Sequence, residues 1–235
     1  MSNILILGNG CRESCIAEKI SLSERVKNVF FFPGSDMFFS NKISKVFIPE
    51  GGIPEFCKKN KVDYVFPGGE KWLCEGITDT LQTIGIPTFG PDLEASRLES
   101  CKIFGKGVMK TFDIQTPTYR IFQTLQLAKE HIYDNIEKKF VIKNPNLDRG
   151  KGVYLPVNTL QATEILDHLI NVKKCKSVII EERITGEEVS LMGFCNGKEI
   201  FLAPQSRDYK KIFDGESGPN TGGLGAVSPV SVLSE

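Results

Sequence analysis

The segment Phe140–Gly152, with the sequence FVIKNPNLDRGKG, decides how the rest of the chain is interpreted. Its aromatic and β-branched start, Phe140–Ile142, predicts a strand that ends at Lys143. The polar residues that follow cannot continue a strand or a helix, so they predict a loop. Within that loop, Gly150-Lys151-Gly152 would let the backbone approach an anion and present a cation to it. The pattern is typical of a nucleotide triphosphate site, although a solvated hairpin turn can have the same residues.

Composition limits the class of protein. The 235 residues include 29 Lys plus Arg and 29 Asp plus Glu, so no net charge attracts the chain to nucleic acid or to a membrane surface. No run of eighteen apolar residues is present, and the uncharged start Met1-Ser2-Asn3 is not a secretory signal. The seven cysteines have no metal-type spacing, which favours reduced thiols inside a cell. We therefore expect a soluble, cytoplasmic protein of one or two domains.

The N-terminal segment has the order strand, glycine turn and helix. A strand at Ile4–Leu7 leads through Gly8-Asn9-Gly10 into a helix predicted for Cys11–Leu22. The free amides at such a helix N-terminus can bind an anion, and Arg12 could pair with a phosphate. Glu13 takes the place of the third glycine of a dinucleotide-binding turn, so we expect no NAD site and a phosphate or sulfate ion as the occupant. The same turn also occurs as a plain connection.

Strands and helices continue to alternate through the first hundred residues. The expected strands are Val29–Phe32, Lys45–Ile48, Tyr64–Phe66 and a short one at Thr88-Phe89, with helices at Ile53–Asn60 and from Glu70 through Ile84. The turn before Glu70 would bring that carboxylate to the carboxyl edge of the sheet, where open α/β sheets bind ligands. This order predicts a parallel sheet that is covered by helices on both faces.

The order of elements changes between residue 102 and Phe140, where we place a domain boundary, and the chain from Phe140 onward does not continue the first sheet. Helices are expected at Lys102–Thr111, Thr124–Ile136 and Leu160–Ile170, and strands at Tyr119–Phe122, Val153–Leu155 and Val178–Glu182. A hairpin then joins Val189–Cys195 to Glu199–Leu202 through Asn196-Gly197. We interpret the region as a small α+β lobe.

Paired carboxylates follow the strand at Val178–Ile180. Glu181 and Glu182 end it, and Gly186 leads to Glu187 and Glu188. Such carboxylates can accept hydrogen bonds from an adenine amino group and from ribose hydroxyls. Surface turns contain similar pairs, but the position after the glycine-lysine loop favours nucleotide binding.

Three stretches together resemble a known family. Lys102, the loop from Lys143 to Gly152 and the carboxylate segment resemble the ATP-grasp fold. GNGCRE at residues 8–13 and GPNTGGLGA at residues 218–226 resemble the phosphoribosylamine-glycine ligases, also called glycinamide ribonucleotide synthetases. The resemblance implies ATP-dependent ligation of glycine to 5-phosphoribosylamine through a glycyl phosphate. The products would be glycinamide ribonucleotide, ADP and phosphate.

The resemblance also implies a fold, domain limits and site residues. It implies a Rossmann-like pre-ATP-grasp domain at residues 1–101, the first part of an ATP-grasp domain with its nucleotide-binding lobe at 102–190, and an incomplete start of the large lobe at 191–235. ATP would meet Lys102, Lys143, Asp148, Gly150, Lys151, Gly152, Glu181, Glu182, Ile184 and Glu188. Glycine and the phosphoribosyl group would meet Asp208, Lys210 and Asp214 as catalytic residues, and Gly8, Gly10, Arg12, Glu13, Glu70 and the Asn220-Thr221-Gly222-Gly223 turn as binding residues. Asp208 and Lys210 could instead form a surface ion pair.

Several positions depart from the family pattern. Cys11 and Ser14 replace a usual glycine and histidine, Lys71-Trp72 replaces alanine-proline, and Asn144 to Arg149 replaces a small-residue run. Family members also continue into a segment with magnesium ligands that is absent here, so we assign no metal ligand. We expect a C-terminal half on the same or another chain, and little turnover by these 235 residues alone, because magnesium offsets charge during phosphoryl transfer. The alternatives are a non-catalytic nucleotide- or phosphoribosyl-binding regulator, or another carboxylate-amine ligase.

Overall fold

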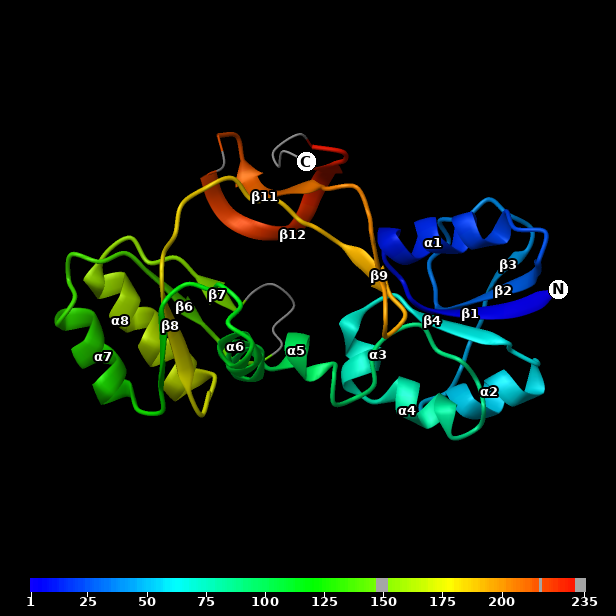
Figure 1. Cartoon of the computed structure of the whole chain (residues 1–235), viewed down its shortest axis with the longest axis horizontal. Coiled ribbons are helices and arrows are strands. Elements are labelled where there is room, and N and C mark those ends of the chain that lie inside the picture. The colour runs from blue at the N-terminus through cyan, green and yellow to red at the C-terminus, as the bar shows by residue number, and fades with distance from the viewer. Residues whose placement is uncertain (147–151, 216, 231–235) are drawn as a thin grey trace. The chain divides into compact units, whose positions relative to one another are not determined.

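The computed structural model describes residues 1–146, 152–215 and 217–230 and divides into two compact units, Met1–Gly105 and Lys106–Glu235 (Figure 1). The first unit contains β1 (Ser2–Gly8), α1 (Cys11–Ser21), β2 (Val26–Pro33), β3 (Ile43–Lys45), α2 (Ile53–Lys59), β4 (Tyr64–Pro67), α3 (Glu70–Cys74), α4 (Ile77–Gln82) and α5 (Arg97–Ser100). Helix α6 (Lys102–Thr111) spans the boundary. The predicted three-part division at residues 101 and 190 stays a proposal.

The second unit contains the remaining elements. They are β5 (Tyr119–Phe122), α7 (Leu125–Tyr133), β6 (Phe140–Lys143), β7 (Val153–Tyr154), α8 (Thr159–Asp167), the π-helical η1 (His168–Val172), β8 (Val178–Glu182), β9 (Gly193–Cys195), β10 (Ile200–Leu202), β11 (Arg207–Phe213) and β12 (Ser217–Val227). None of the helices in the described residues is long and apolar enough to cross a lipid bilayer.

The sheet of the first unit is parallel, as predicted. Its strand order is β3-β2-β1-β4, and Thr88 adds an isolated parallel bridge to Val65. The chain places β2 and β3 on one side of β1 and β4 on the other, so the direction of winding reverses between β1 and β4. Open α/β sheets bind ligands beside the carboxyl ends of strands at such a reversal. The turns after Leu7 and Pro67, which pair in the sheet, therefore lie at a favourable edge.

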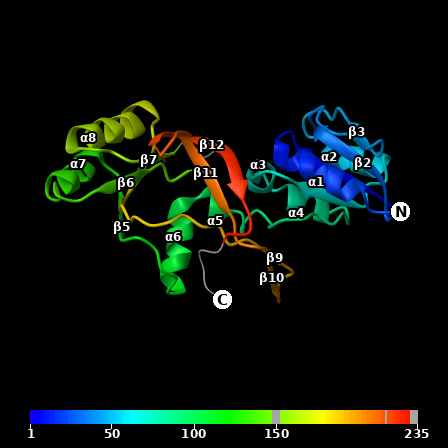
Figure 2. The same cartoon turned by 90° about the horizontal axis from the view of Figure 1, so that it is seen from above.

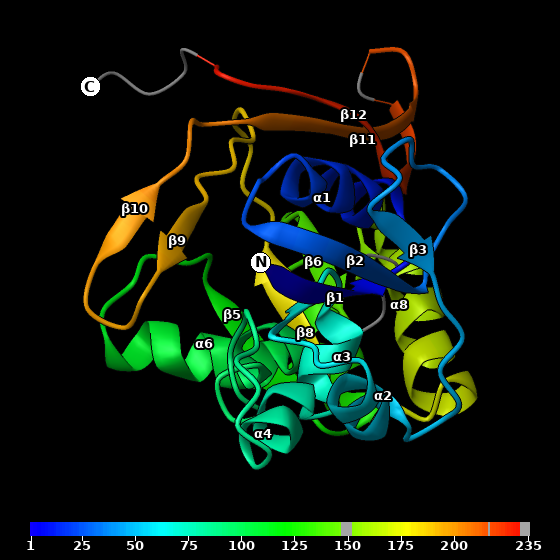
Figure 3. The same cartoon turned by 90° about the vertical axis from the view of Figure 1, so that its right-hand side faces the viewer.

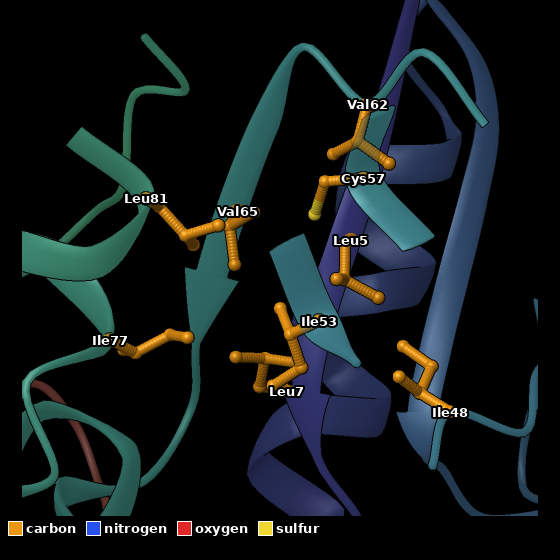
Figure 4. Packing of buried hydrophobic residues seen from close by; sticks show 9 residues of the cluster. All are labelled: Leu5, Leu7, Ile48, Ile53, Cys57, Val62, Val65, Ile77 and Leu81. Carbon is orange, nitrogen blue, oxygen red and sulfur yellow. The ribbon is translucent and has the colours of Figure 1, made fainter. Parts of the chain in front are cut away.

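Side-chain alternation in β1 divides the core of this unit into two layers. Leu5 and Leu7 pack with α2, β4 and α4, whereas Ile6 packs with Ala17 of α1 and Phe31 of β2 (Figure 4 shows the first layer). Because successive strand residues point to opposite faces, an unbroken apolar run is the pattern of a strand covered on both sides. Helix α1 covers one face, and α2 and α4 cover the other, which confirms the predicted layering.

Cys57 lies in the first of these layers and is 1% exposed. Burial raises the pKa of its thiol to about 11. Since the thiolate is the reactive form, we expect Cys57 to resist iodoacetamide at pH 8 in the folded protein, while the exposed Cys11 and Cys15 react. Mass spectrometry of the alkylated peptides measures this, with urea-unfolded protein as the control. Modification of Cys57 at the rate of Cys11 would contradict the burial.

Two predictions for this unit are wrong in position. The strand expected at Lys45–Ile48 is β3, Ile43–Lys45, because Ile43 pairs with Val29 and is buried, whereas Phe47 is 86% exposed. The single helix expected from Glu70 through Ile84 is two helices, α3 and α4. Gly76 separates them at φ +77°, a left-handed conformation that glycine adopts without the cost of a Cβ.

The second unit has an antiparallel sheet with the order β5-β8-β6-β7. Helices α7 and α8 pack on one of its faces, where Ile132, Phe140, Ile142, Leu166 and Ile180 form the centre of the core. Helix and antiparallel sheet in this arrangement confirm the predicted α+β lobe. The helix expected at Leu160–Ile170 begins at Thr159 and changes to π-helical geometry at His168.

Two hairpins complete the described chain. β9 pairs with β10 and β11 with β12 (Figures 2 and 3). β9 begins at Gly193, four residues later than the expected Val189. The segment Asn220–Gly223 is not the predicted turn between elements, because it lies inside β12. The hairpin β9–β10 exposes apolar side chains, namely Phe194, Ile200, Phe201 and Leu202, each more than half exposed.

Candidate functional site

The two faces of the second unit's sheet carry different chemistry. Ile180 of β8 faces the α7–α8 core, so Glu181 points to the opposite face. In the sheet register, Glu181 lies between Tyr119 of β5 and Val141 of β6, and Lys143 follows two residues later on β6. Strands β6 and β8 therefore direct Lys143 and Glu181, two of the predicted nucleotide ligands, to the same face of the sheet.

On that face, Glu181 binds two lysines. Lys143 Nζ donates a 2.7 Å hydrogen bond to Glu181 Oε2, and Lys106 Nζ lies 3.1 Å from Glu181 Oε1. Lys106 also donates to Thr116 Oγ1 at 2.5 Å, and its ammonium lies 4.9 Å from the centre of the Tyr119 ring. We call these residues, Lys106, Thr116, Tyr119, Lys143 and Glu181, the lysine–glutamate cluster.

Burial differs sharply within the cluster. The side chain of Glu181 is 2% exposed and that of Lys106 is 9% exposed, whereas that of Lys143 is 25% exposed. Two ammonium groups around one carboxylate leave one positive charge in excess. Lys143 is the more accessible of the two cations, so an anionic group in solution would reach its ammonium first.

The predicted nucleotide ligands differ in how accessible they are in the structure. The Glu181 carboxylate is directed to lysines rather than to solvent, while Glu182 and Ile184 are exposed and accessible. Gly152 is buried, and its carbonyl accepts a 2.8 Å hydrogen bond from the amide of Asn144. Asp148, Gly150 and Lys151 lie outside the described residues. Lys102 begins α6 in the first unit, and its contact with a phosphate stays a prediction.

Lys210 joins residues that were predicted for two different roles. Its ammonium lies 2.5 Å from Glu188 Oε1 and 3.1 Å from Asp208 Oδ2, so the predicted ribose ligand and two of the three predicted catalytic residues form one partly exposed network. The hydrogen bond that Lys210 donates to Glu188, with a further one donated to Asp208, raises the pKa of Lys210 above its ordinary value. Lys210 is therefore a cation near neutral pH and cannot act there as a general base. Asp214 lies beyond the end of β11, away from this network.

The glycine-rich segment of β12 forms a bulge opposite Lys210. Tyr209 pairs with Gly225 and Lys211 with Asn220, so Lys210 alone faces the four residues from 221 to 224. Thr221 Oγ1 donates a 2.9 Å hydrogen bond to the carbonyl of Lys210 and accepts one of 3.1 Å from the amide of Gly223. Bulges of this kind redirect side chains next to binding sites. The backbone of residues 220–223, which were predicted to bind substrate, is thus held beside Lys210.

In the first unit, Glu13 occupies the edge where β1 and β4 end. Its carboxylate accepts a 2.7 Å hydrogen bond from the amide of Gly10 and lies 3.3 Å from Arg12 Nε, and the residue is 6% exposed. The carboxylate therefore already takes an amide at the N-terminus of α1 that a bound anion would use. Arg12 is largely exposed, and Glu70 begins α3 at the same edge. Anion binding at Gly8 to Arg12 stays a prediction.

Gly68 gives the Glu13 side chain its space. A Cβ on Gly68 would lie 2.1 Å from Glu13 Cγ, so Gly68→Ala must displace a buried side chain. We expect a loss of about 1–3 kcal/mol of unfolding free energy, measured by urea denaturation followed by the fluorescence of Trp72. The matched control is Gly69→Ala, since, apart from its chain neighbours, no described residue has an atom within 4 Å of a Cβ there. Equal stability of the two variants would contradict this packing.

A cleft of about 440 Å³ opens on the helix side of the sheet and shares Tyr119 and Glu181 with the lysine–glutamate cluster. Basic side chains line much of it, namely Arg120, His131, Lys138, Lys139 and Arg183, together with the carboxylates Glu181 and Glu182. Burial, and next the charges of Arg120 and Lys138, lower the pKa of His131, so its imidazole is neutral at pH 7. The cleft therefore includes two of the predicted nucleotide ligands, Glu181 and Glu182, but not Lys143, which points to the other face of the sheet.

Lys106, Thr116 and Tyr119 are not among the site residues predicted from the sequence. Lys106 lies one helical turn after Lys102, so a search for lysines on the same face of α6 would have found it. Nothing in the sequence marks Thr116 or Tyr119 as partners of a buried ammonium, because those contacts depend on how β5 and α6 pack.

Comparison with known proteins decides the family. The family model for the N domain of phosphoribosylglycinamide synthetase matches residues 2–99, and the model for its ATP-grasp (A) domain matches residues 100–235. The chain belongs to the phosphoribosylglycinamide synthetase family. It therefore has the pre-ATP-grasp and ATP-grasp lobes that the resemblance implied, in the predicted order.

Individual relatives agree with this family. A phosphoribosylamine–glycine ligase from Halalkalibacterium halodurans is 38% identical over 99% of this chain, which spans 56% of that protein's length. A bifunctional purine biosynthetic protein from Pichia angusta is 37% identical over 98% of the chain, which spans 30% of it. The crystal structure of a phosphoribosylamine–glycine ligase from Thermotoga maritima superposes with a TM-score of 0.81, at 29% identity, over 98% of this chain and 56% of that one. The chain thus spans about half the length of such single-function relatives.

Proposed function

We propose that the chain is the ATP-binding, N-terminal portion of a phosphoribosylamine–glycine ligase that acts in purine biosynthesis. The observation that carries the proposal is that both family models match in order and together extend from residue 2 to residue 235. The lysine–glutamate cluster supports it independently, since it holds a partly exposed lysine, Lys143, at the end of a strand, where the sequence predicts a phosphate ligand.

The proposed reaction has two transfers. A carboxylate oxygen of glycine attacks the γ-phosphorus of ATP, the bond to the β,γ-bridging oxygen breaks, and ADP leaves with that electron pair. The amine of 5-phosphoribosylamine then attacks the carbonyl carbon of glycyl phosphate. Phosphate leaves, the nitrogen loses a proton to solvent, and glycinamide ribonucleotide is formed. Positioning and charge stabilisation supply most of the catalysis in such phosphoryl transfers.

Different residues of this chain would bind the different parts of ATP and of the two substrates. Lys143 and Lys102 would hold phosphate oxygens, Glu182 and the backbone at Ile184 would meet the adenine, and the exposed Glu188 would meet the ribose. Lys210, held by Asp208 and Glu188, would act as a cation toward glycine or the phosphoribosyl group. Other predicted contacts are Gly8, Gly10, Arg12, Glu13 and Glu70 in the first unit, and Asp214, Asn220, Thr221, Gly222 and Gly223 on the β11–β12 hairpin.

Magnesium would offset charge on the phosphates in a reaction of this class. Within residues 1–146, 152–215 and 217–230, no three His, Cys, Asp or Glu side chains lie together as a group that could hold a metal ion.

A further stretch of polypeptide is the proposed partner. The ligases that this chain resembles are longer, and β9–β10 is a two-stranded hairpin with uncovered apolar side chains. Two strands alone are marginally stable in water, and a covering sheet or helix would stabilise them. The additional length of the relatives is the proposed source of that cover.

Two measurements test the proposed function. The chain alone should bind ADP in a calorimetric titration. A chimera in which it replaces the matching portion of the Halalkalibacterium ligase should release ADP when both glycine and phosphoribosylamine are supplied, and D-alanine should not replace glycine. The proposal would be wrong if the chain bound no ADP, or if the folded chimera released ADP regardless of the amino acid. Preference for another amino acid would favour a different carboxylate-amine ligase.

A further inference from the structure

We propose that Lys106 is a positioning residue that neutralises Glu181, so that the ammonium of Lys143 remains available to the phosphates of a nucleotide. The inference rests on the proposed nucleotide binding and adds a residue to that site. Lys106 itself is too deeply placed for direct contact with a ligand, because its side chain is 9% exposed.

Lys106 is fixed by three neighbours. Its ammonium donates to Thr116 Oγ1 at 2.5 Å, lies 3.1 Å from Glu181 Oε1 and is 4.9 Å from the centre of the Tyr119 ring. A lysine side chain has considerable rotamer freedom, and these contacts restrict it. A group held this firmly provides a constant charge at one position.

Glu181 needs that charge. Both of its oxygens are inside the protein, and within the described residues Oε1 accepts no hydrogen bond of normal geometry. The ion pair with Lys106 therefore compensates the charge at Oε1, while Oε2 accepts from Lys143 at 2.7 Å. A buried carboxylate with insufficient compensation attracts any cation within reach.

Lys143 is the cation within reach. With Lys106 present, the two lysines and Glu181 carry a net charge of one positive unit, which is expressed at the more exposed Lys143. Without Lys106, Lys143 and Glu181 become a neutral pair. The ammonium would then be retained by the carboxylate, and its attraction for phosphate would fall.

The experiment compares ADP and adenosine as probes in calorimetric titrations of the full 235-residue chain. For Lys106→Met we expect the dissociation constant for ADP to rise by about tenfold or more, the scale of one charged hydrogen bond, and that for adenosine to stay unchanged. The double variant Lys106→Met/Glu181→Gln should recover most of the ADP affinity, because a neutral amide in place of the carboxylate no longer retains Lys143. Lys110→Met, on an exposed position of the same helix, is the control and should behave like the unmodified chain.

A merely structural role for Lys106 gives a different result. Loss of packing alone would weaken ADP and adenosine equally, and adding Glu181→Gln would weaken them further. Either result, with ADP bound by the unmodified chain, would overturn this inference and leave the proposed function intact. Failure of the unmodified chain to bind ADP would instead overturn the proposed function, and this inference with it.

Discussion

Replacing Glu181 with glutamine is expected to cost about 3–5 kcal/mol of unfolding free energy, because the change leaves Lys106 buried without its counter-charge. The carboxylate is 2% exposed and compensates two ammonium groups. Lys143 can turn toward water when the carboxylate is lost, since a quarter of its side chain is exposed, but Lys106 has no such route. The loss should therefore fall on the second unit.

Two optical signals locate the effect. The chain has one tryptophan, Trp72, which lies in the first unit, so its fluorescence follows unfolding of that unit. Circular dichroism follows both units. In urea, Glu181→Gln should lower the midpoint of the dichroism transition and leave the fluorescence transition in place. The matched control is Glu182→Gln, whose exposed neighbouring carboxylate should contribute within about 0.5 kcal/mol. Equal behaviour of the two variants would show that Glu181 is not the counter-charge of a buried lysine.

The sequence was sufficient for the fold because the strongest signals are local. Unbroken apolar runs such as Ile4–Leu7 are typical of strands that are covered on both faces. Because these runs alternate with helical segments, they predict a parallel sheet. The antiparallel lobe was recognisable from the strand at Phe140 and the carboxylate-ended strand at Val178. Errors came where a local pattern was ambiguous. Val46-Phe47-Ile48 has the composition of a strand, but in the structure it is Ile43 that pairs with Val29 of β2, and β3 ends at Lys45.

The site was less predictable because its contacts join distant residues. Lys143 and Glu181 are 38 positions apart and were both identified from the ends of their strands. Their direct bond, and the approach of Lys106, depend on the tertiary arrangement of β6, β8 and α6. Glu188 and Lys210 were assigned to ribose and to catalysis, yet they bind each other across 22 positions. In the sequence, Glu13 was notable because it stands where a dinucleotide-binding turn has its third glycine. Only the structure shows that its side chain occupies the space left by Gly68.

Lys143→Ala is expected to weaken ADP binding by about ten- to hundredfold, which is the scale for removing a charged hydrogen bond to phosphate. The protein should remain folded, because the buried carboxylate of Glu181 is still compensated by the ammonium of Lys106. Lys143 ends β6 and is the more accessible of the two lysines in the lysine–glutamate cluster, so we expect an incoming phosphate to contact its ammonium. Calorimetric titration with ADP, and separately with adenosine, measures the effect and assigns it to the phosphates.

The matched control is Lys139→Ala, which removes the same charge just before the opposite end of the same strand. If general electrostatic attraction held the nucleotide, both variants would lose similar affinity, and the difference between low and high salt would shrink equally in both. A specific site predicts a large loss for Lys143→Ala alone, with adenosine binding unchanged. Unaltered ADP affinity in Lys143→Ala would show that the nucleotide lies elsewhere, and the cationic cleft beside Arg120 and Arg183 on the other face of the sheet would then be the next region to test.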